Sequence, residues 1–230
     1  HLLAKRDVIM ANPATPDALP ALVPDVIGED TLWACTTCGY CEAACPIELE
    51  HLPKFYRMRQ QRVLMEGAFP HELKPVFEAY EAQSNPWGFP SDTRGDWAQD
   101  LGVTRVETAD DVKNLDYLFY VGSAASFDPR GQKIARAFAA ILQQAGVRFG
   151  ILGPAETSTG ECVRRAGNEM LFQQLANDLV AKLNGLGVIR IVTCDPHAFN
   201  TLKNEYPEFG GQWEVIHHTQ LIAELVAEGR

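Results

Sequence analysis

The run Cys35-Thr-Thr-Cys38-Gly-Tyr-Cys41-Glu-Ala-Ala-Cys45-Pro46 contains four of the six cysteines in the chain. Its spacing is C-x2-C-x2-C-x3-C-P, which is typical of the thiolates that hold a 4Fe–4S cluster. Zinc sites more often take their ligands as two separated pairs. A chance grouping, or one that forms disulfides, is a far weaker explanation because the spacing is so specific. We therefore predict that Cys35, Cys38, Cys41 and Cys45 are ligands of iron–sulfur clusters of the 4Fe–4S type.

The last cysteine of the run indicates that a second motif belongs to the site. In ferredoxins with two clusters, the cysteine before the proline ligates the other cluster. Cys35, Cys38 and Cys41 would then hold three irons of one cluster, whose fourth ligand lies elsewhere. The remaining cysteines, Cys162 and Cys194, are far away in the sequence, and the chain does not begin with methionine. We expect the chain to be a piece of a longer protein with a partner motif upstream.

Length, composition and charge limit the classes of protein to which the chain can belong. With 230 residues, 46% of them hydrophobic, it can form one large domain or two small ones with a buried core. No apolar run approaches the roughly 18 residues of a membrane span, and the N-terminal stretch lacks the apolar core of a signal peptide. The net charge of -10 argues against a nucleic-acid partner. Because cluster thiolates need a reducing compartment, we expect the cytoplasm, or the cytoplasmic face of a membrane as part of a larger protein.

The first part of the chain is predicted to be helical around the cysteine run. Residues 1 to 28 contain four prolines and are expected to form an irregular lead-in after a short helix. Apolar residues recur at helical spacing over 52–66, and Gly67 is placed to end that helix. A second helix is expected over 71–82, before the Pro86 that helices avoid.

The second part of the chain is predicted to alternate strands with helices. Strands are expected over residues 115–121, 147–152, 188–193 and 213–216. Helices are expected over residues 133–145, 162–184, 198–205 and 219–228. This alternation indicates βαβ units and a mostly parallel sheet covered by helices. We therefore predict an α/β fold class, with an α-helical ferredoxin-like domain over 1–90, N-terminally incomplete, followed by an α/β domain over 91–230.

Ligands of parallel α/β sheets bind at the carboxyl ends of the strands. Those ends carry Ser123, the segment 156–160, the segment 194–197, and His217-His218. Cys162, Cys194 and His197 could form a second metal site, and the loop 195–197 with His217-His218 could bind a metal or transfer protons. The two cysteines could also form a redox pair. The structural alternatives are that the histidines hydrogen-bond to backbone groups at turns and that the cysteines are small buried side chains.

We favour structural roles for two charged motifs. Arg94-Gly95-Asp96 is predicted to form a turn rather than an adhesion motif, because nothing else points to the cell surface. Arg164-Arg165 begins a predicted helix and is expected to pair with Glu161 or Glu169. Neither a G-x-G-x-x-G nor a Walker sequence is present, so nucleotide binding has little support.

Three segments resemble a known family. They are Asp30-Thr-Leu-Trp-Ala-Cys35-Thr-Thr-Cys38-Gly-Tyr-Cys41, Arg164-Arg165-Ala-Gly-Asn168-Glu169 and Phe199-Asn-Thr-Leu-Lys-Asn-Glu-Tyr-Pro207. They resemble the heterodisulfide-reductase-related iron–sulfur reductases, above all the membrane-anchored branch that passes electrons from electron-transfer flavoprotein to menaquinone. The resemblance covers residues 30–229. It implies a ferredoxin domain followed by the first of two cysteine-rich α/β domains, a flavoprotein electron donor, and a quinone-side or membrane subunit as partner.

The chain departs from that family in its α/β part. Members place cysteines after the first strand, in Glu-x-Cys-Thr-Gly and in Cys-Pro-His-Cys. The corresponding residues here are Ser123, Ser158, Asp195 and Ala198. Serine, aspartate and alanine are poor ligands for the soft iron of a cluster. We therefore expect the α/β domain to lack the cluster that the resemblance would otherwise imply.

Three hypotheses about function follow from these residues. The first is an iron–sulfur electron-transfer subunit that relays electrons between a reduced flavoprotein and an acceptor such as a quinone. The second is a non-catalytic docking module whose α/β domain has lost its cluster. The third is a disulfide reductase that uses Cys162 and Cys194.

Overall fold

The computed structural model describes residues 20–230, so the short helix expected near the N-terminus lies outside the described residues. The chain divides into two compact units. The cysteine unit comprises the residues up to Phe69 together with Arg165–Asn168, and the sheet unit comprises Pro70–Arg164 and Glu169–Arg230. The second predicted helix falls in the sheet unit, whereas the sequence-based boundary after residue 90 assigns it to the first domain. That domain division stays a prediction.

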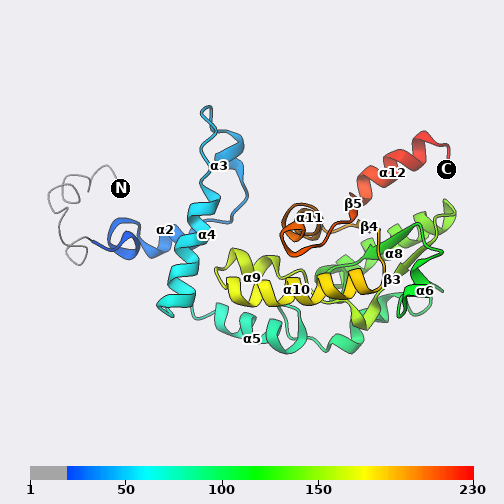
Figure 1. Cartoon of the computed structure of the whole chain (residues 1–230), viewed down its shortest axis with the longest axis horizontal. Helices are drawn as coiled ribbons and strands as arrows, with labels where there is room; N and C mark the ends of the chain where they lie inside the picture. The colour runs from blue at the N-terminus through cyan, green and yellow to red at the C-terminus, as the bar shows by residue number, and fades with distance from the viewer. Residues whose placement is uncertain (1–19) are drawn as a thin grey trace. The chain divides into compact units, whose positions relative to one another are not determined.

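The described part of the cysteine unit consists of short helices joined by loops (Figure 1). They are η2 (Leu22–Val26), α2 (Glu29–Ala34), α3 (Tyr40–Ala43), α4 (Leu52–Gln60) and η3 (Gln61–Met65). The run of α4 and η3 confirms the helix predicted over 52–66. The Arg62 side chain pairs with both Glu29 and Glu66, which ties η3 to the start of α2.

The sheet unit contains five parallel strands, which confirms the predicted α/β fold class. They are β1 (Thr104–Arg105), β2 (Tyr117–Tyr120), β3 (Phe149–Ile151), β4 (Arg190–Thr193) and β5 (Glu214–His217), in the order β1-β3-β2-β4-β5. In the central register, Leu118 lies between Gly150 and Ile191. The short β1 was not predicted, because both of its residues are exposed and carry no apolar pattern.

α-Helices, 3-10 helices and the π-helix η6 connect and cover these strands. In chain order they are α5 (Leu73–Gln83), η4 (Ser91–Ala98), α6 (Ala109–Val112), α7 (Ser123–Phe127), α8 (Pro129–Gln144), η5 (Gly153–Ala155), α9 (Glu161–Arg165), α10 (Glu169–Gly185), α11 (Pro196–Asn200), η6 (Thr201–Glu205), η7 (Tyr206–Phe209) and α12 (His218–Ala227). Helix α8 begins earlier than predicted because the Asp128 carboxylate accepts the N–H groups of Arg130 and Gly131, at 2.9 and 2.8 Å. Within residues 20–230, no helix has the length and apolar character that a bilayer crossing requires.

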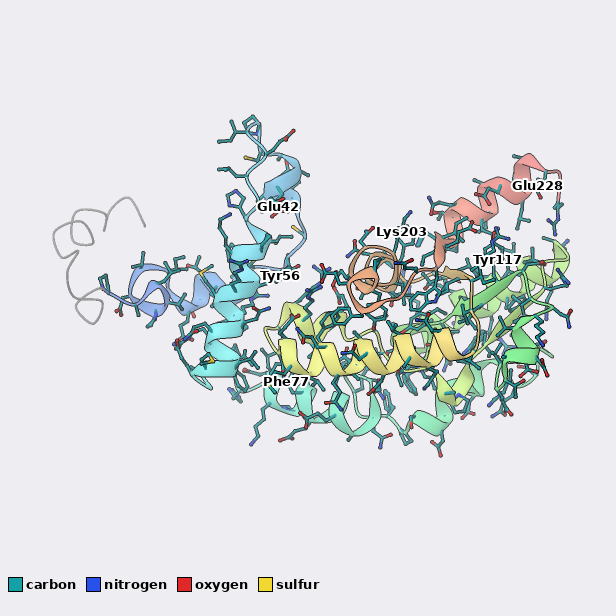
Figure 2. All side chains as sticks on the ribbon, in the orientation of Figure 1. Glu42, Tyr56, Phe77, Tyr117, Lys203 and Glu228 are labelled. Carbon is teal, nitrogen blue, oxygen red and sulfur yellow. The ribbon has the colours of Figure 1, made fainter. Side chains whose placement is uncertain are left out.

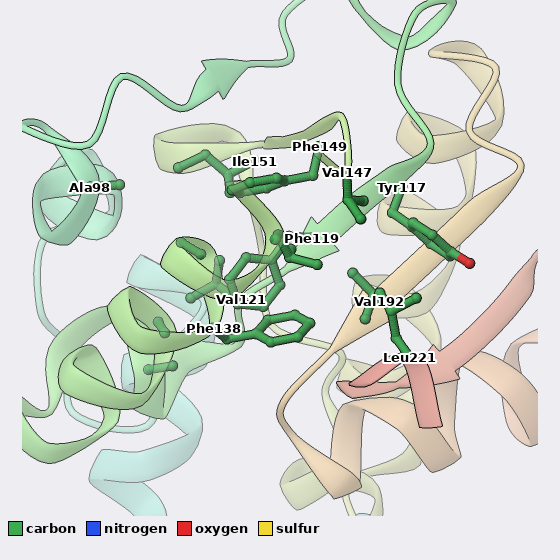
Figure 3. Close-up of a cluster of buried hydrophobic side chains, with 14 of the residues drawn as sticks. Ala98, Tyr117, Phe119, Val121, Phe138, Val147, Phe149, Ile151, Val192 and Leu221 are labelled. Atoms are coloured by element: carbon green, nitrogen blue, oxygen red, sulfur yellow. The ribbon is translucent and has the colours of Figure 1, made fainter. Parts of the chain in front are cut away.

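Side chains of β2 alternate between the two faces of the sheet, since successive strand residues point in opposite directions. Phe119 meets Phe138 of α8 and Phe149 of β3 on one face, with ring centroids 5.2 and 6.3 Å apart (Figure 3). Leu118 packs into the core of the opposite face with Leu179 of α10. A sheet that is buried on both faces needs nearly continuous apolar strands. This explains why four of the strands could be predicted.

The single helix predicted over 162–184 is wrong, because the chain breaks between α9 and α10. Gly167 lies in this break with a backbone φ of +95°, a conformation that side chains with a Cβ disfavour. A Cβ added there would lie 2.6 Å from the carbonyl carbon and oxygen of Arg59.

We therefore expect Gly167→Ala to lower the free energy of unfolding by about 1–3 kcal/mol, as judged by urea unfolding followed by circular dichroism. Gly185→Ala is the matched control, because Gly185 ends α10 with open space around it. That control should change the stability by less than about 1 kcal/mol. Equal losses in the two variants would contradict the explanation.

Candidate cluster-binding segment and sheet-edge cavity

All four cysteines of the predicted cluster motif carry free thiols. Cys35 directly follows α2, Cys41 lies in α3, and Cys38 and Cys41 are exposed. Backbone N–H groups donate to two of the sulfurs: Thr37 to Cys35 and Leu49 to Cys45, each at 3.4 Å. Such N–H···S bonds stabilise thiolate charge and are among the contacts that set the potential of an iron–sulfur cluster.

The backbone between the first cysteines turns sharply. Thr37 and Gly39 have positive φ angles of 55° and 76°, which reverse the chain on both sides of Cys38. The Tyr40 backbone N–H and the Thr36 side chain lower the pKa of the Cys38 thiol. A lowered pKa favours the thiolate, which is the form that ligates metal.

Glu42 connects the end of the cysteine segment to helix α4. Its carboxylate accepts the N–H of Leu52 at 2.6 Å and so ties α3 to the first residue of α4 (Figure 2). In the part of the chain that the structure describes, no three His, Cys, Asp or Glu side chains come together as a bound metal would require. The thiols therefore fit a cluster by their chemistry and spacing, while their assignment as ligands stays a prediction.

A buried arginine supports the start of the cysteine segment. Arg59 of α4 is 5% exposed, and its Nη2 donates to the carbonyl oxygens of Leu32 at 2.8 Å and Cys35 at 2.6 Å. Its Nη1 donates to the Arg165 carbonyl at 2.8 Å. Burial lowers the pKa of Arg59, and the negative charge of the Cys35 thiolate opposes that effect. A fixed positive charge therefore lies beside the first cysteine.

A second arginine holds the same segment. The Nη1 atom of Arg165 donates to the Tyr56 hydroxyl at 2.8 Å and to the Thr37 carbonyl at 3.4 Å; Tyr56 lies on α4 (Figure 2). The neighbouring Arg164 behaves as predicted, because it pairs with Glu169 at 3.3 Å.

A cavity of about 370 Å³ opens at the carboxyl ends of the central strands of the sheet unit. Strands β3 and β4 flank β2, so the chain reverses its winding direction there, and ligands of open α/β sheets bind at such a point. The substituted positions Ser123, Ser158, Asp195 and Ala198 all line this cavity. So do Cys162, Cys194 and His197. The structure therefore gathers Ser123, Ser158 and the segment 194–197, whereas His217 and His218 do not line the cavity. It provides no geometric support for a second metal site among residues 20–230.

Comparison with known proteins identifies the family. The chain is 44% identical over 218 residues to the probable iron–sulfur-binding oxidoreductase FadF of Bacillus subtilis, covering 93% of this chain and 31% of that protein. It is 41% identical over 212 residues to the EtfAB:quinone oxidoreductase of Syntrophomonas wolfei, covering 91% and 30%. It is 26% identical over 210 residues to a subunit of the dihydromethanophenazine:CoB–CoM heterodisulfide reductase of Methanosarcina barkeri, covering 86% and 48%.

The chain belongs to the heterodisulfide-reductase-related iron–sulfur reductases. The chain spans about a third of the length of its FadF and EtfAB:quinone oxidoreductase relatives. No family model matches it. No solved structure matches it either.

A buried ion pair lies beside the cavity of the sheet unit. The Glu156 carboxylate accepts the N–H groups of Val121 and Gly122, each at 2.9 Å, and the Nε of Arg94 at 3.3 Å. The Nη2 of Arg94 also donates to the Ser123 hydroxyl at 2.9 Å. Arg94 lies in the 3-10 helix η4, so the turn predicted for Arg94-Gly95-Asp96 is corrected to a 3-10 helix whose arginine is buried.

A hydrogen-bonded chain along the cavity wall was not predicted from the sequence. The Cys162 thiol donates to one oxygen of Glu161 at 3.2 Å, and His197 Nδ1 lies 3.0 Å from the other. Tyr80 also lines the cavity, and burial raises the pKa of its hydroxyl. Glu161 could have been suggested by its place beside Cys162, whereas no sequence pattern sets Tyr80 apart from the other aromatic residues of its helix.

His217, at the end of β5, caps the N-terminus of the helix that follows. The Nδ1 atom of His217 lies 2.8 Å from the Thr219 hydroxyl, and the Gln220 side chain accepts the His217 N–H at 3.0 Å. These contacts form the N-terminal cap of α12. They favour the structural interpretation of His217 over a metal-binding one.

Proposed function

We propose that this chain is an electron-transfer part of an iron–sulfur oxidoreductase. Cys35, Cys38, Cys41 and Cys45 supply the thiolate ligands for 4Fe–4S cluster binding. The observation that carries the proposal is the cysteine run itself, with backbone N–H donors on the Cys35 and Cys45 sulfurs. The printed name of the FadF relative, an iron–sulfur-binding oxidoreductase, supports it. The cysteine segment would belong to a ferredoxin-like domain over 1–90, followed by an α/β domain over 91–230.

The residues around the segment have defined tasks in this proposal. A cluster stores and releases single electrons. Arg59 and Arg165 hold the backbone of Cys35 and Thr37 and supply positive charge beside the thiolates. The N–H donors to Cys35 and Cys45 disperse the negative charge of the sulfurs, and Glu42 fixes the return of the chain to α4.

The proposed donor is a reduced flavoprotein, and the proposed acceptor is a quinone or a quinone-side membrane subunit. The name of the Syntrophomonas wolfei relative, EtfAB:quinone oxidoreductase, supports this assignment. We propose the cytoplasm as the compartment, or the cytoplasmic face of a membrane within a larger protein, because the six free cysteines suit a reducing environment.

The test is the content of iron and acid-labile sulfide in the anaerobically reconstituted chain, with an EPR spectrum after dithionite reduction. We expect about four irons per chain and the signal of a reduced cubane cluster. A reconstituted chain that is folded but free of iron would contradict the proposal.

Disulfide reduction has less support than electron relay. Burial raises the pKa of Cys194 to about 12, and burial also raises the pKa of Cys162. Thiolates are the reactive species in thiol–disulfide exchange, so both thiols are poorly prepared for it at neutral pH. The docking hypothesis rests on the four substituted positions around the cavity, and it predicts tight binding of the flavoprotein without electron transfer.

A further inference from the structure

The cavity at the strand ends of the sheet unit has aromatic walls. Its volume of about 370 Å³ falls within the range of small-molecule sites. Two buried tyrosines, Tyr80 and Tyr120, line it together with the exposed Trp87 and Ile134. These walls suit a ligand with an apolar body.

The loop that carries Trp87 is fixed by one side-chain amide. Asn85 is fully buried, and its Oδ1 accepts the N–H groups of Trp87 at 3.2 Å and Phe89 at 3.1 Å. Its Nδ2 donates to the carbonyl oxygens of Gln83 at 3.0 Å and Phe89 at 2.8 Å. The exposed rings of Trp87 and Phe89 have centroids 6.2 Å apart. Because the loop is already ordered, a ligand that covers these rings loses little conformational entropy on binding.

The backbone N–H groups that could bind an anion here are occupied by carboxylates of the chain itself. The N-termini of helices favour anions. Asp195 accepts the N–H groups at the start of α11, at 2.8 and 3.3 Å. Glu156 accepts the two N–H groups that precede α7, each at 2.9 Å. A phosphate or carboxylate ligand would therefore find these donors already bonded.

The charged side chains of the cavity wall are acidic. Among the described residues that line the cavity, Asp195 and Glu161 are the acidic ones, and none is a lysine or an arginine. Glu161 is 4% exposed, and Oδ2 of Asp195 lies 2.8 Å from the position that a Cβ on Gly122 would take. Burial and the negative charge of Asp195 both raise the pKa values of Cys162 and Cys194, which also line the cavity. The field of this carboxylate therefore acts inside the cavity.

The nearby Arg94 does not reverse this negative charge. Its Nη2 donates to the Ser123 hydroxyl at the cavity wall at 2.9 Å, while its Nε pairs with the buried Glu156 at 3.3 Å. That pair is neutral as a whole, so the charge of Asp195 and Glu161 sets the sign of the cavity. Carboxylates beside aromatic rings are suited to organic cations, because the ring faces attract the cation and the carboxylates compensate its charge.

We propose that this cavity binds an ammonium or guanidinium group carried on an apolar stem. Asp195 and Glu161 hold the cation, and the rings of Tyr80, Tyr120 and Trp87 cover the stem. The ligand is either a free amine or a lysine or arginine side chain of a partner protein, and the chemistry inside the cavity is the same for both. Binding of this cation needs no iron, so it stands or falls independently of the proposed electron transfer.

Three probes of similar size and different charge test the sign of the cavity: phenethylamine, phenethyl alcohol and the carboxylate hydrocinnamate. Calorimetric titration of the full chain at neutral pH should give saturable one-to-one binding of phenethylamine. Phenethyl alcohol has the same stem without the charge and should bind about tenfold more weakly, and hydrocinnamate more weakly still. Absence of saturable amine binding, or binding of the alcohol or the carboxylate as tightly as the amine, would overturn the proposal.

Two aspartates that cap helices separate the charge of the cavity from the stability of the fold. Asp195→Asn removes the charge and keeps a good N-cap for α11, so it should weaken binding of phenethylamine about tenfold and leave phenethyl alcohol unchanged. Asp128→Asn is the matched control, because the exposed Asp128 caps α8 in the same way and does not line the cavity. It should change neither affinity by more than about twofold. Equal effects of the two variants would overturn the assignment.

A pair of peptides distinguishes the two sources of the cation. Acetyl-Phe-Arg-Phe-amide carries a guanidinium, and its counterpart with citrulline in place of arginine carries a neutral group of nearly the same shape. A partner side chain as ligand predicts that the arginine peptide binds about tenfold tighter than phenethylamine, because its flanking rings reach Trp87 and Phe89. A free amine as ligand predicts that phenethylamine binds and the arginine peptide does not. Binding of both peptides with equal affinity would contradict the cation site.

Discussion

Replacing Cys38 by alanine is expected to abolish the iron–sulfur absorbance and the EPR signal of the reconstituted chain. The Cys38 thiol is exposed, and the Tyr40 N–H lowers its pKa, so it is well prepared to ligate iron. Within residues 20–230, no cluster of three potential ligands is available to take its place. Iron content should fall from about four per chain to near zero, since a cubane cluster with a lost thiolate is poorly held. Retained visible absorbance would contradict the ligand assignment.

Three further cysteine variants complete this experiment. Cys162→Ala and Cys194→Ala are the controls, because both side chains line the sheet-unit cavity, and each should leave the iron content unchanged. Cys45→Ala separates two ligand schemes. If Cys45 serves a second cluster, as in two-cluster ferredoxins, this variant keeps more iron than Cys38→Ala. Equal losses in the two variants would assign both thiols to one cluster.

The cysteine segment illustrates what a sequence can and cannot predict about a metal site. The spacing of Cys35 to Cys45 identifies the ligand chemistry, because it depends only on the order of residues. The spatial gathering of the thiols does not follow from it, since binding of metal supplies the free energy that assembles such a site. The contacts of Arg59 and Arg165 were also beyond prediction, because their partners are as many as 128 residues away.

The sheet unit also combines features that the sequence predicts with features that it does not. Buried parallel strands such as β2 and β4 could be predicted because both of their faces are apolar. The break at Gly167 was missed because the apolar periodicity continues through it, and only the contact with Arg59 requires the positive φ. Glu161 and Cys162 are neighbours in the sequence, but His197 follows β4 and is 36 residues from Glu161. Local sequence patterns do not predict a contact over that separation.

Replacing Arg94 by methionine is expected to destabilise the sheet unit strongly. Arg94 and Glu156 are 1% and 2% exposed, and Arg94 is the cation that pairs with the buried carboxylate. Without it, Glu156 stays buried with only the N–H groups of Val121 and Gly122 as partners. Leaving one member of a buried ion pair uncompensated costs about 3–5 kcal/mol. Urea unfolding at pH 7.5 should show a loss of that size.

The pH dependence of this loss provides a sharper test. Burial raises the pKa of Glu156, and the positive charge of Arg94 acts against that increase. A carboxyl whose pKa is higher in the folded state stabilises the fold below its usual pKa and loses this contribution as the pH rises through the raised value. Removing Arg94 raises the folded pKa of Glu156 further. The destabilisation by Arg94→Met should therefore be smaller at pH 5 than at pH 7.5.

Matched variants separate burial of charge from loss of the side chain. Arg148→Met breaks an exposed pair with Asp116 and should cost less than about 1 kcal/mol. Combining Arg94→Met with Glu156→Gln removes the buried charge and keeps one acceptor oxygen, which can accept only one of the two N–H groups of Val121 and Gly122. The double variant should recover part of the stability lost in Arg94→Met and lose its dependence on pH. If Arg94→Met were no worse than Arg148→Met, the ion pair would not be what holds the strand ends around the cavity.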